Sequence, residues 1–179
     1  MADWSEIVQQ HGWVVWKTAH RLLCNEADVA DCFQNTFVSA LKLSRTEAIR
    51  HWPALLRRLA TARALERLRQ RRRESGRLTT LPEGSIVDAR ATEPEQAAEA
   101  SELAEDLRKA LVNLDERQAQ VFCLACLEGL SYEQITEQLG LTVNHVGVLL
   151  NRARTSLRER LQAHAPMPAA KRLKREEQS

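Results

Sequence analysis

Residues 130–154, LSYEQITEQLGLTVNHVGVLLNRAR, contain two amphipathic patterns separated by a short turn. Ser131 and Gln134 have the spacing of a capping box, so a helix is expected to begin there. Gly140 is the residue type that commonly ends a helix, and Thr142 is a suitable N-cap for the helix that follows. The apolar positions of the two helices can face each other across this turn. The segment therefore predicts a helix-turn-helix.

If the second helix of this motif lies in a DNA major groove, its first turns would carry the base contacts. Asn can make a bidentate contact to adenine, and Arg to guanine. The candidate DNA-binding residues of this segment are Thr142, Asn144, His145, Val148, Asn151, Arg152 and Arg154. A plain helical hairpin inside a bundle is the alternative. The caps, the turn and the polar face together favour DNA binding.

Helical periodicity also covers most of the remaining chain. Apolar residues recur every three or four positions over residues 3–24, 27–43 and about 52–74. Further helices are expected over about 97–113 and from Asp115 to near Gly129. Good helix formers dominate, aromatic residues make up only 4% of the chain, and alternating β-branched runs are scarce. The sequence therefore predicts an all-α fold.

The segment 76–98 interrupts this pattern with two glycines and two prolines and predicts a flexible linker. The expected organisation is two small helical modules, 1–75 and 99–163, followed by a disordered tail, 164–179. The charge distribution agrees with separate modules. Residues 1–79 carry 14 Lys and Arg against 8 Asp and Glu, whereas residues 80–110 carry 3 against 8.

The third helical pattern is rich in arginine. Its members are Arg57, Arg58, Arg63, Arg67, Arg69, Arg71, Arg72, Arg73 and Arg77. Like charges three or four positions apart on a helix repel each other, and Glu66 and Glu74 are too few to pair with all of them. A phosphate backbone would offset this repulsion. The pattern favours nucleic-acid binding over the alternative, a solvated basic face.

The four cysteines include a CxxC pair, Cys123 and Cys126. Neither a second CxxC nor a nearby His completes a metal ligand set, so the cysteines are interpreted as buried structural thiols. Trp13, Trp16 and Trp52 are likewise expected to pack in the core, although Trp52 also has the chemistry to stack on unpaired bases.

No part of the sequence predicts an enzyme, because nothing supplies a general base, a phosphate-binding loop or a metal set. No cofactor is expected. No apolar run approaches about 20 residues, so no membrane span is expected. The acidic N-terminus lacks a signal-peptide core, and a cytoplasmic protein is therefore expected.

Three stretches resemble the extracytoplasmic-function group of bacterial sigma factors of the sigma-70 class. HRLLCNEADVADCFQNTFVSALK resembles the signature of region two. WPALLRRLATARALERLRQRRR is similar to the helix of regions 2.3–2.4, and LDERQAQVFCLACLEGLSYEQITEQLGLTVNHVGVLLNRARTSLRERL is similar to region four. The resemblance covers roughly residues 10–75 and 108–162.

The resemblance implies a role for each module. The residues expected to dock on the clamp helices of the RNA polymerase β′ subunit are Asp28, Asp31, Gln34 and Asn35. The residues expected to hold the minus-ten promoter element are Arg57, Arg58, Arg63, Arg67, Arg69 and Arg71. Region four would read the minus-thirty-five element and bind a flap of the β subunit, and an anti-sigma factor is an expected partner. A stand-alone helix-turn-helix regulator that binds operators as a dimer remains the alternative.

The sequence departs from the family pattern at several positions. Ala62 stands where the family usually has an Asn that helps to form a pocket for a flipped promoter base. Glu66 stands where Asp is common, and Asn35 replaces a usual Glu. In region four the usual Gly-Thr-Val-Lys-Ser-Arg is Asn-His-Val-Gly-Val-Leu, residues 144–149, so two basic residues are lost. A different or weaker minus-thirty-five preference is therefore expected.

Overall fold

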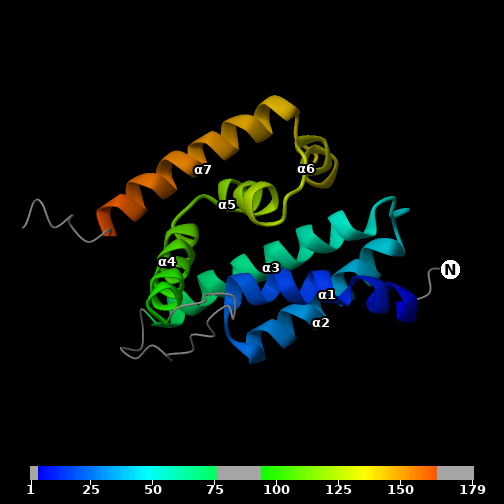
Figure 1. Cartoon of the computed structure of the whole chain (residues 1–179). Coiled ribbons are helices and arrows are strands. Elements are labelled where there is room, and N and C mark those ends of the chain that lie inside the picture. The colour runs from blue at the N-terminus through cyan, green and yellow to red at the C-terminus, as the bar shows by residue number, and fades with distance from the viewer. Residues whose placement is uncertain (1–3, 76–93, 165–179) are drawn as a thin grey trace, which may run out of the picture.

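A computed structural model describes residues 4–75 and 94–164, and in these ranges it contains helices and no strand (Figure 1). The first module consists of α1 (Trp4–Leu23), α2 (Glu26–Ser44) and α3 (Trp52–Ser75). The second consists of α4 (Pro94–Val112), α5 (Glu116–Phe122), the π-helix η1 (Cys123–Leu127), α6 (Tyr132–Leu139) and α7 (Val143–His164). The all-α prediction is confirmed.

The predicted capping residues define the helix boundaries of the second module. The carboxylate of Asp115 accepts hydrogen bonds from two backbone N–H groups in the first turn of α5. Ser131 and Gln134 form both hydrogen bonds of the capping box, and Gly140 ends α6 in the left-handed region with φ +64°. The hydroxyl of Thr142 accepts a hydrogen bond from the backbone N–H of His145 at the start of α7, 3.2 Å away. The helix-turn-helix therefore forms as the sequence predicts.

Two helix boundaries differ from the predictions. The fourth helix begins at Pro94, a few residues earlier than expected, because proline is tolerated in the first turn of a helix. The helix expected to run from Asp115 to near Gly129 instead changes from α to π geometry at Cys123. Gly129 then follows it in the left-handed region, with φ +68°. The other linker positions, 76–93, and the tail from residue 165 lie outside the described residues.

Aromatic contacts contribute to the core of the first module. Trp52 packs edge to face on Trp4, with ring centroids 5.5 Å apart, and Trp16 contacts Phe33. These two tryptophans therefore pack as expected. The prediction for Trp13 is wrong, because its side chain is 71% exposed. It lies on the solvent-facing stripe of α1, one turn from the exposed Gln10.

The two modules are packed against each other. One hydrophobic cluster contains Leu22 of α1 and Leu65 and Leu68 of α3, together with Leu111 of α4 and Leu157 of α7. The third helix lies against α4, α5, η1 and α6 (Figure 1). The helix that carries six of the DNA-binding candidates therefore lies against the second module.

The cysteines have three different environments. Cys32 and Cys123 are buried, Cys24 is half-buried and Cys126 is exposed, so the interpretation as buried thiols is wrong for Cys126. Cys126 lies in η1, and its side chain is on the exposed side of that element. In the described ranges, His, Cys, Asp and Glu side chains form no cluster suited to a metal ion. None of the described helices combines the length and the apolar character that a membrane span requires.

Candidate nucleic-acid interface

An exposed polar stripe runs along α2. Asp31, Gln34 and Asn35 lie on it together, at the spacing that places side chains on one helix face. Val38 continues the same stripe, and its side chain is 48% exposed. Val38 was not among the predicted docking residues, although its position seven residues after Asp31 places it on this face. We call Asp31, Gln34, Asn35 and Val38 the α2 stripe.

Asp28 does not belong to the α2 stripe. Only 7% of its side chain is exposed, and it pairs with Arg67, whose Nε lies 3.0 Å from Oδ1. Arg71 pairs with the other carboxylate oxygen and also donates a hydrogen bond to the carbonyl of Leu23. The carboxylate and its two cationic partners link α2 to α3, and removal of one partner from such a buried pair is destabilising. The structure therefore places Asp28 in the interior of the first module.

The arginines of α3 find carboxylates on other elements as well as on their own helix. Arg63 pairs with Glu66 at 2.9 Å and donates a hydrogen bond to Ser39. Arg57 lies 3.8 Å from a carboxylate oxygen of Glu128, in the second module. These contacts relieve the repulsion that the sequence pattern implied. Of the six arginines expected to contact the minus-ten element, Arg63 alone is classed as exposed, and the other five are half-buried.

Arg58 is half-buried. Burial lowers the pKa of its guanidinium group, an effect partly opposed by Glu47. The side chain borders an open hollow that it shares with Asp115 and Gln138 of the second module. Arg69 is also half-buried, and its Nη2 has no hydrogen-bond partner within the described ranges. Both side chains therefore face packed structure as well as solvent.

Glu128 joins the two modules. Its carboxylate accepts a hydrogen bond from the Thr18 hydroxyl at 2.7 Å and pairs with Arg21 at 2.8 Å and Arg57 at 3.8 Å. Its side chain is 8% exposed. Arg21 also donates a hydrogen bond to the carbonyl of Leu127. This contact between the modules was not predicted from the sequence. The available signal was a single acidic residue directly after the apolar run CLACL.

A second exposed stripe lies on α7. It contains Asn144, His145, Val148, Asn151 and Arg152, and we call it the α7 stripe. The opposite face of α7 is buried, with Val146 and Leu150 in the core of the second module. The structure thus brings five of the seven DNA-binding candidates of this segment onto one face, after the cap made by Thr142. Leu149, which stands where the family usually has Arg, is buried.

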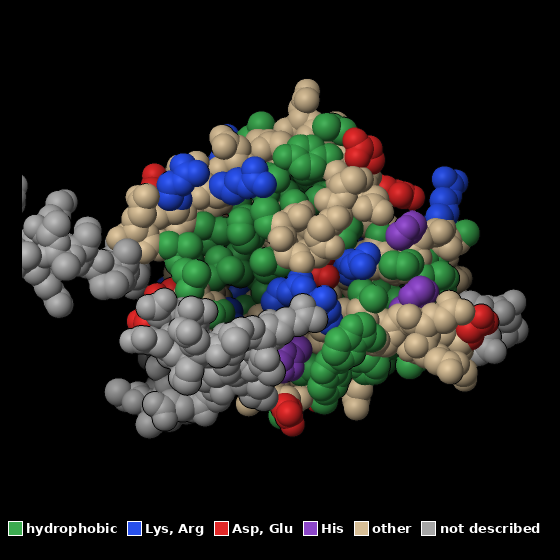
Figure 2. All heavy atoms as spheres, in the orientation of Figure 1, with side chains coloured by type: hydrophobic (Ala, Val, Ile, Leu, Met, Phe, Trp, Pro, Cys, Tyr) green, Lys and Arg blue, Asp and Glu red, His purple; other side chains and the backbone are tan. Residues whose placement is uncertain are grey.

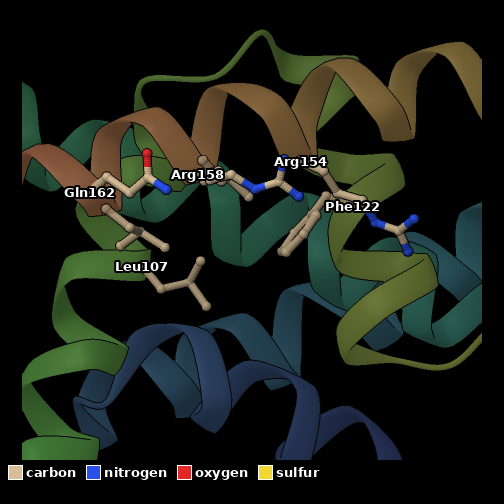
Figure 3. Close-up of a pocket in the computed structure, with 7 residues that line it drawn as sticks. Leu107, Phe122, Arg154, Arg158 and Gln162 are labelled. Carbon is tan, nitrogen blue, oxygen red and sulfur yellow. The ribbon is translucent and has the colours of Figure 1, made fainter.

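Arg154 lies on a different side of α7 from the α7 stripe. Its Nη2 is 3.6 Å from Sγ of Cys126. With Arg158 it borders an open apolar groove of about 460 Å³ between α4, α5 and α7, lined by Leu107, Phe122, Leu157 and Leu161 (Figure 3). Figure 2 shows hydrophobic side chains gathered in this area, with Lys or Arg side chains above them. This groove was not predicted.

Comparisons with known families match both modules. The profile of "Sigma-70 region 2" matches residues 7–74, and the profile of "Sigma-70, region 4" matches residues 104–157. The chain is 34% identical over 166 residues to the ECF RNA polymerase sigma factor SigE of Mycolicibacterium smegmatis, covering 92% of this chain and 64% of that protein. It is 24% identical to the ECF RNA polymerase sigma factor SigW of Bacillus subtilis, covering 88% of each chain.

Two solved structures share the fold. The sigma factor RpoE of Bartonella quintana, solved with the anti-sigma factor NepR, superposes with a TM-score of 0.57 at 20% identity, covering 90% of this chain and 98% of that one. CnrH, solved with the cytosolic domain of CnrY, superposes with a TM-score of 0.53 at 24% identity, covering 89% and 87%.

Proposed function

Because the chain belongs to the extracytoplasmic-function sigma factors of the sigma-70 class, we propose that it binds core RNA polymerase and directs transcription initiation at specific promoters. The chain spans 64% of the length of SigE, so the function of that whole protein is carried over here only as a proposal. The observation that carries the proposal is the presence of two exposed polar stripes, one in each module. Sigma factors are non-enzymatic regulators, and we propose no catalytic step for this chain.

The α2 stripe is the proposed contact with the clamp helices of the β′ subunit. The polar groups of the stripe come from Asp31, Gln34 and Asn35. Val38 adds an apolar side chain that is exposed to water in the free chain. Protein interfaces combine such apolar contacts with a polar rim. Asp28 has a supporting role in this proposal, because its carboxylate holds α3 against α2.

The minus-ten element is the proposed ligand of α3. Arg63 is accessible for a phosphate contact as the structure stands. Arg57 and Arg58 lie beside the second module, so their contact with DNA requires the two modules to move apart. Arg67, Arg69 and Arg71 stay candidates, with Arg67 and Arg71 also engaged by Asp28. Ala62 gives α3 only a small side chain at the position where the family usually selects a flipped base.

The minus-thirty-five element is the proposed ligand of the α7 stripe. Thr142 caps the start of the helix, and the stripe residues of its first three turns are exposed on one face. The apolar groove between α4, α5 and α7 is a separate surface, which we propose receives the β flap. Its apolar lining suits an amphipathic helix, and Arg154 and Arg158 suit acidic residues beside that helix.

Two further proposals concern the cellular setting. Core polymerase and promoter DNA are in the bacterial cytoplasm, and we propose that the chain acts there. An anti-sigma factor is the proposed regulator, supported by the complex of the structurally similar RpoE with NepR. Such a partner would compete with polymerase for one or both exposed stripes.

Run-off transcription tests the proposed function. Purified core polymerase, the full chain and fragmented DNA of the source bacterium would be combined, and transcript starts would be sequenced. Discrete starts that depend on the chain are the expected result. Replacement of Asp31, Gln34 and Asn35 by alanine should abolish these starts by preventing core binding. Starts that are the same with and without the chain would contradict the proposal.

A stand-alone regulator is the second candidate because the helix-turn-helix and the α7 stripe alone suffice for operator binding. This reading leaves the α2 stripe without a role. Co-purification with core polymerase separates the two candidates. A chain that binds duplex DNA as a dimer and never retains core polymerase would be a stand-alone regulator.

A further inference from the structure

The α7 stripe has an unusual composition for a surface that meets a polyanion. At its centre is Val148, which is 47% exposed and lies one helical turn from Asn144 on one side and from Asn151 and Arg152 on the other. Arg152 is the sole Lys or Arg on the stripe. Residues 142–155 include no Asp or Glu. The stripe therefore offers two amides, an imidazole and an aliphatic group, and little positive charge.

Each of these groups has a defined partner in the major groove. The Asn amide matches N6 and N7 of adenine, and an aliphatic side chain matches the 5-methyl group of thymine. Cytosine N4 is read by a carboxylate, which the stripe lacks. Guanine is read by Arg or Lys, and Arg152 is the single candidate. Amide and aliphatic groups side by side therefore match A·T base pairs.

The fold leaves Val148 free for such a contact. Val146, Leu149 and Leu150 fill the core of the second module, so the hydrophobic requirement of α7 is met without Val148. The adjacent Gly147 has no side chain, and the ring of Tyr132 lies at ordinary van der Waals distance from the position that its Cβ would take. No described side chain covers the stripe.

We infer that α7 reads A·T base pairs, with the 5-methyl group of a thymine packed against Val148 and adenine bound by Asn144 or Asn151. This inference rests on the proposed function and names the base pairs that the α7 stripe selects. It also accounts for the loss of two basic residues in 144–149, because specificity shifts from charge to methyl and amide contacts. Burying the methyl group should contribute a roughly fourfold gain in affinity.

Replacing thymine by uracil tests this inference, because it removes the 5-methyl group and leaves base pairing unchanged. The full chain with core polymerase would first select duplexes from a promoter library randomised in the upstream element. The selected duplex would then be remade with one deoxyuridine at a time. We expect A·T enrichment, and a roughly fourfold weaker complex for one thymine position.

Val148→Ala removes both γ-methyl groups and should bind the thymine and uracil duplexes nearly equally at that position. Val148→Thr should keep part of the difference because it keeps one γ-methyl group. Val8→Ala is the matched control, since Val8 is an exposed valine on α1, in the other module, with 37% of its surface accessible. It should behave like the wild type toward uracil. Equal core binding and equal melting temperature would show that the Val148 variants fold.

Two results would overturn the inference and leave the proposed function standing. One is wild-type binding that is indifferent to uracil at every position. The other is a loss of affinity on replacing thymine by uracil that is as large for Val148→Ala as for the wild type. That result would mean that the thymine methyl group packs against a residue other than Val148. A complex with core polymerase that selects no upstream sequence would instead remove the proposed role of α7, and the inference with it.

Discussion

Asp28 and Asp31 lie less than one turn apart on α2, but their side chains have different surroundings. Asp28 is enclosed and pairs with Arg67 and Arg71, whereas Asp31 is exposed on the α2 stripe. The two positions are about 60° apart around the helix, and their burial differs because Arg67 and Arg71 of α3 pair with Asp28. Residue type alone therefore did not distinguish the buried carboxylate from the exposed one.

Asp28→Ala should lower the free energy of unfolding by about 1–3 kcal/mol, because two partly exposed guanidinium groups lose a buried acceptor. Asp31→Ala should change it by less than about 0.5 kcal/mol, as is usual for surface substitutions, but should weaken binding to core polymerase. Urea unfolding measures the first effect, and fluorescence anisotropy with labelled core measures the second. Equal stability losses for the two variants would show that the ion pairs of Asp28 contribute little.

The thiols should differ in reactivity according to burial. Burial raises the pKa of Cys32 to about 11, from the ordinary value of 9.0, and it also raises the pKa of Cys123. At pH 8 iodoacetamide should therefore label the exposed Cys126 first in the folded chain, and should label Cys32 and Cys123 only after unfolding. Mass spectrometry of peptides from timed reactions measures the order.

The raised pKa of Cys32 also predicts that the stability of the fold depends on pH. The thiol of Cys32 ionises near pH 9.0 in the unfolded chain and near pH 11 in the folded chain. Its contribution to stability is thus complete below about pH 9 and is lost as the pH rises toward 11. The free energy of unfolding should fall more steeply over this interval for the wild type than for Cys32→Ala. Parallel pH profiles would mean that Cys32 is less well shielded from water than its burial indicates.

At the scale of single elements, the turn between α6 and α7 fixes the angle at which the α7 stripe is presented. Gly140 adopts φ +64°, and Gly147 lies inside α7 with ordinary helical geometry. A side chain at Gly140 is strained whatever space surrounds it, whereas a methyl group at Gly147 would lie 3.9 Å from Tyr132. The same substitution should therefore have opposite effects at the two positions.

Gly140→Ala should lower the free energy of unfolding by about 1–2 kcal/mol, the cost of the left-handed conformation for an L-residue. Gly147→Ala should raise it by about 0.5–1 kcal/mol through helix propensity. Thermal unfolding followed by circular dichroism measures both. Two destabilised variants would indicate that Tyr132 cannot accommodate the added methyl group.

Sequence patterns predicted the structural features that depend on residues close together in the chain. Capping by Asp115, Ser131 and Thr142 depends on groups at most three residues apart, so it could be read from the sequence. The π geometry of η1 could not, because no residue in CLACL prevents an ordinary α-helix. The exposed stripes follow from helical periodicity, but the assignment of Asp28 to the α2 stripe failed because its partners belong to α3.

At the scale of the whole molecule, contacts distant in sequence determine which surfaces are available. Glu128 meets Thr18, Arg21 and Arg57 across separations that no periodic pattern encodes. The sequence predicted two modules, and their packing against each other depends on this carboxylate and on the shared hydrophobic cluster. The arrangement holds Arg57 and Arg58 beside the second module. The proposed contact of these two arginines with promoter DNA therefore requires this interface to open.

Glu128→Gln should weaken the interface, because removal of the charge leaves Arg21 and Arg57 without a carboxylate inside it. Both guanidinium groups are about one-third exposed, so water compensates part of the loss, and a cost of about 1–3 kcal/mol is expected. The radius of gyration measured by small-angle X-ray scattering should rise, and Arg57 should become free to bind phosphate.

Glu133→Gln is the matched control, because it removes one fully exposed carboxylate of α6 and should leave the radius of gyration unchanged.

If the interface between the modules competes with DNA, Glu128→Gln should also bind promoter duplexes more tightly in the absence of polymerase. Adding Arg57→Ala to Glu128→Gln should cancel this gain in affinity. An expanded chain with unchanged DNA affinity would mean that opening alone does not expose the minus-ten surface. An unchanged radius would mean that the hydrophobic cluster shared by α1, α3, α4 and α7 holds the modules together without the carboxylate.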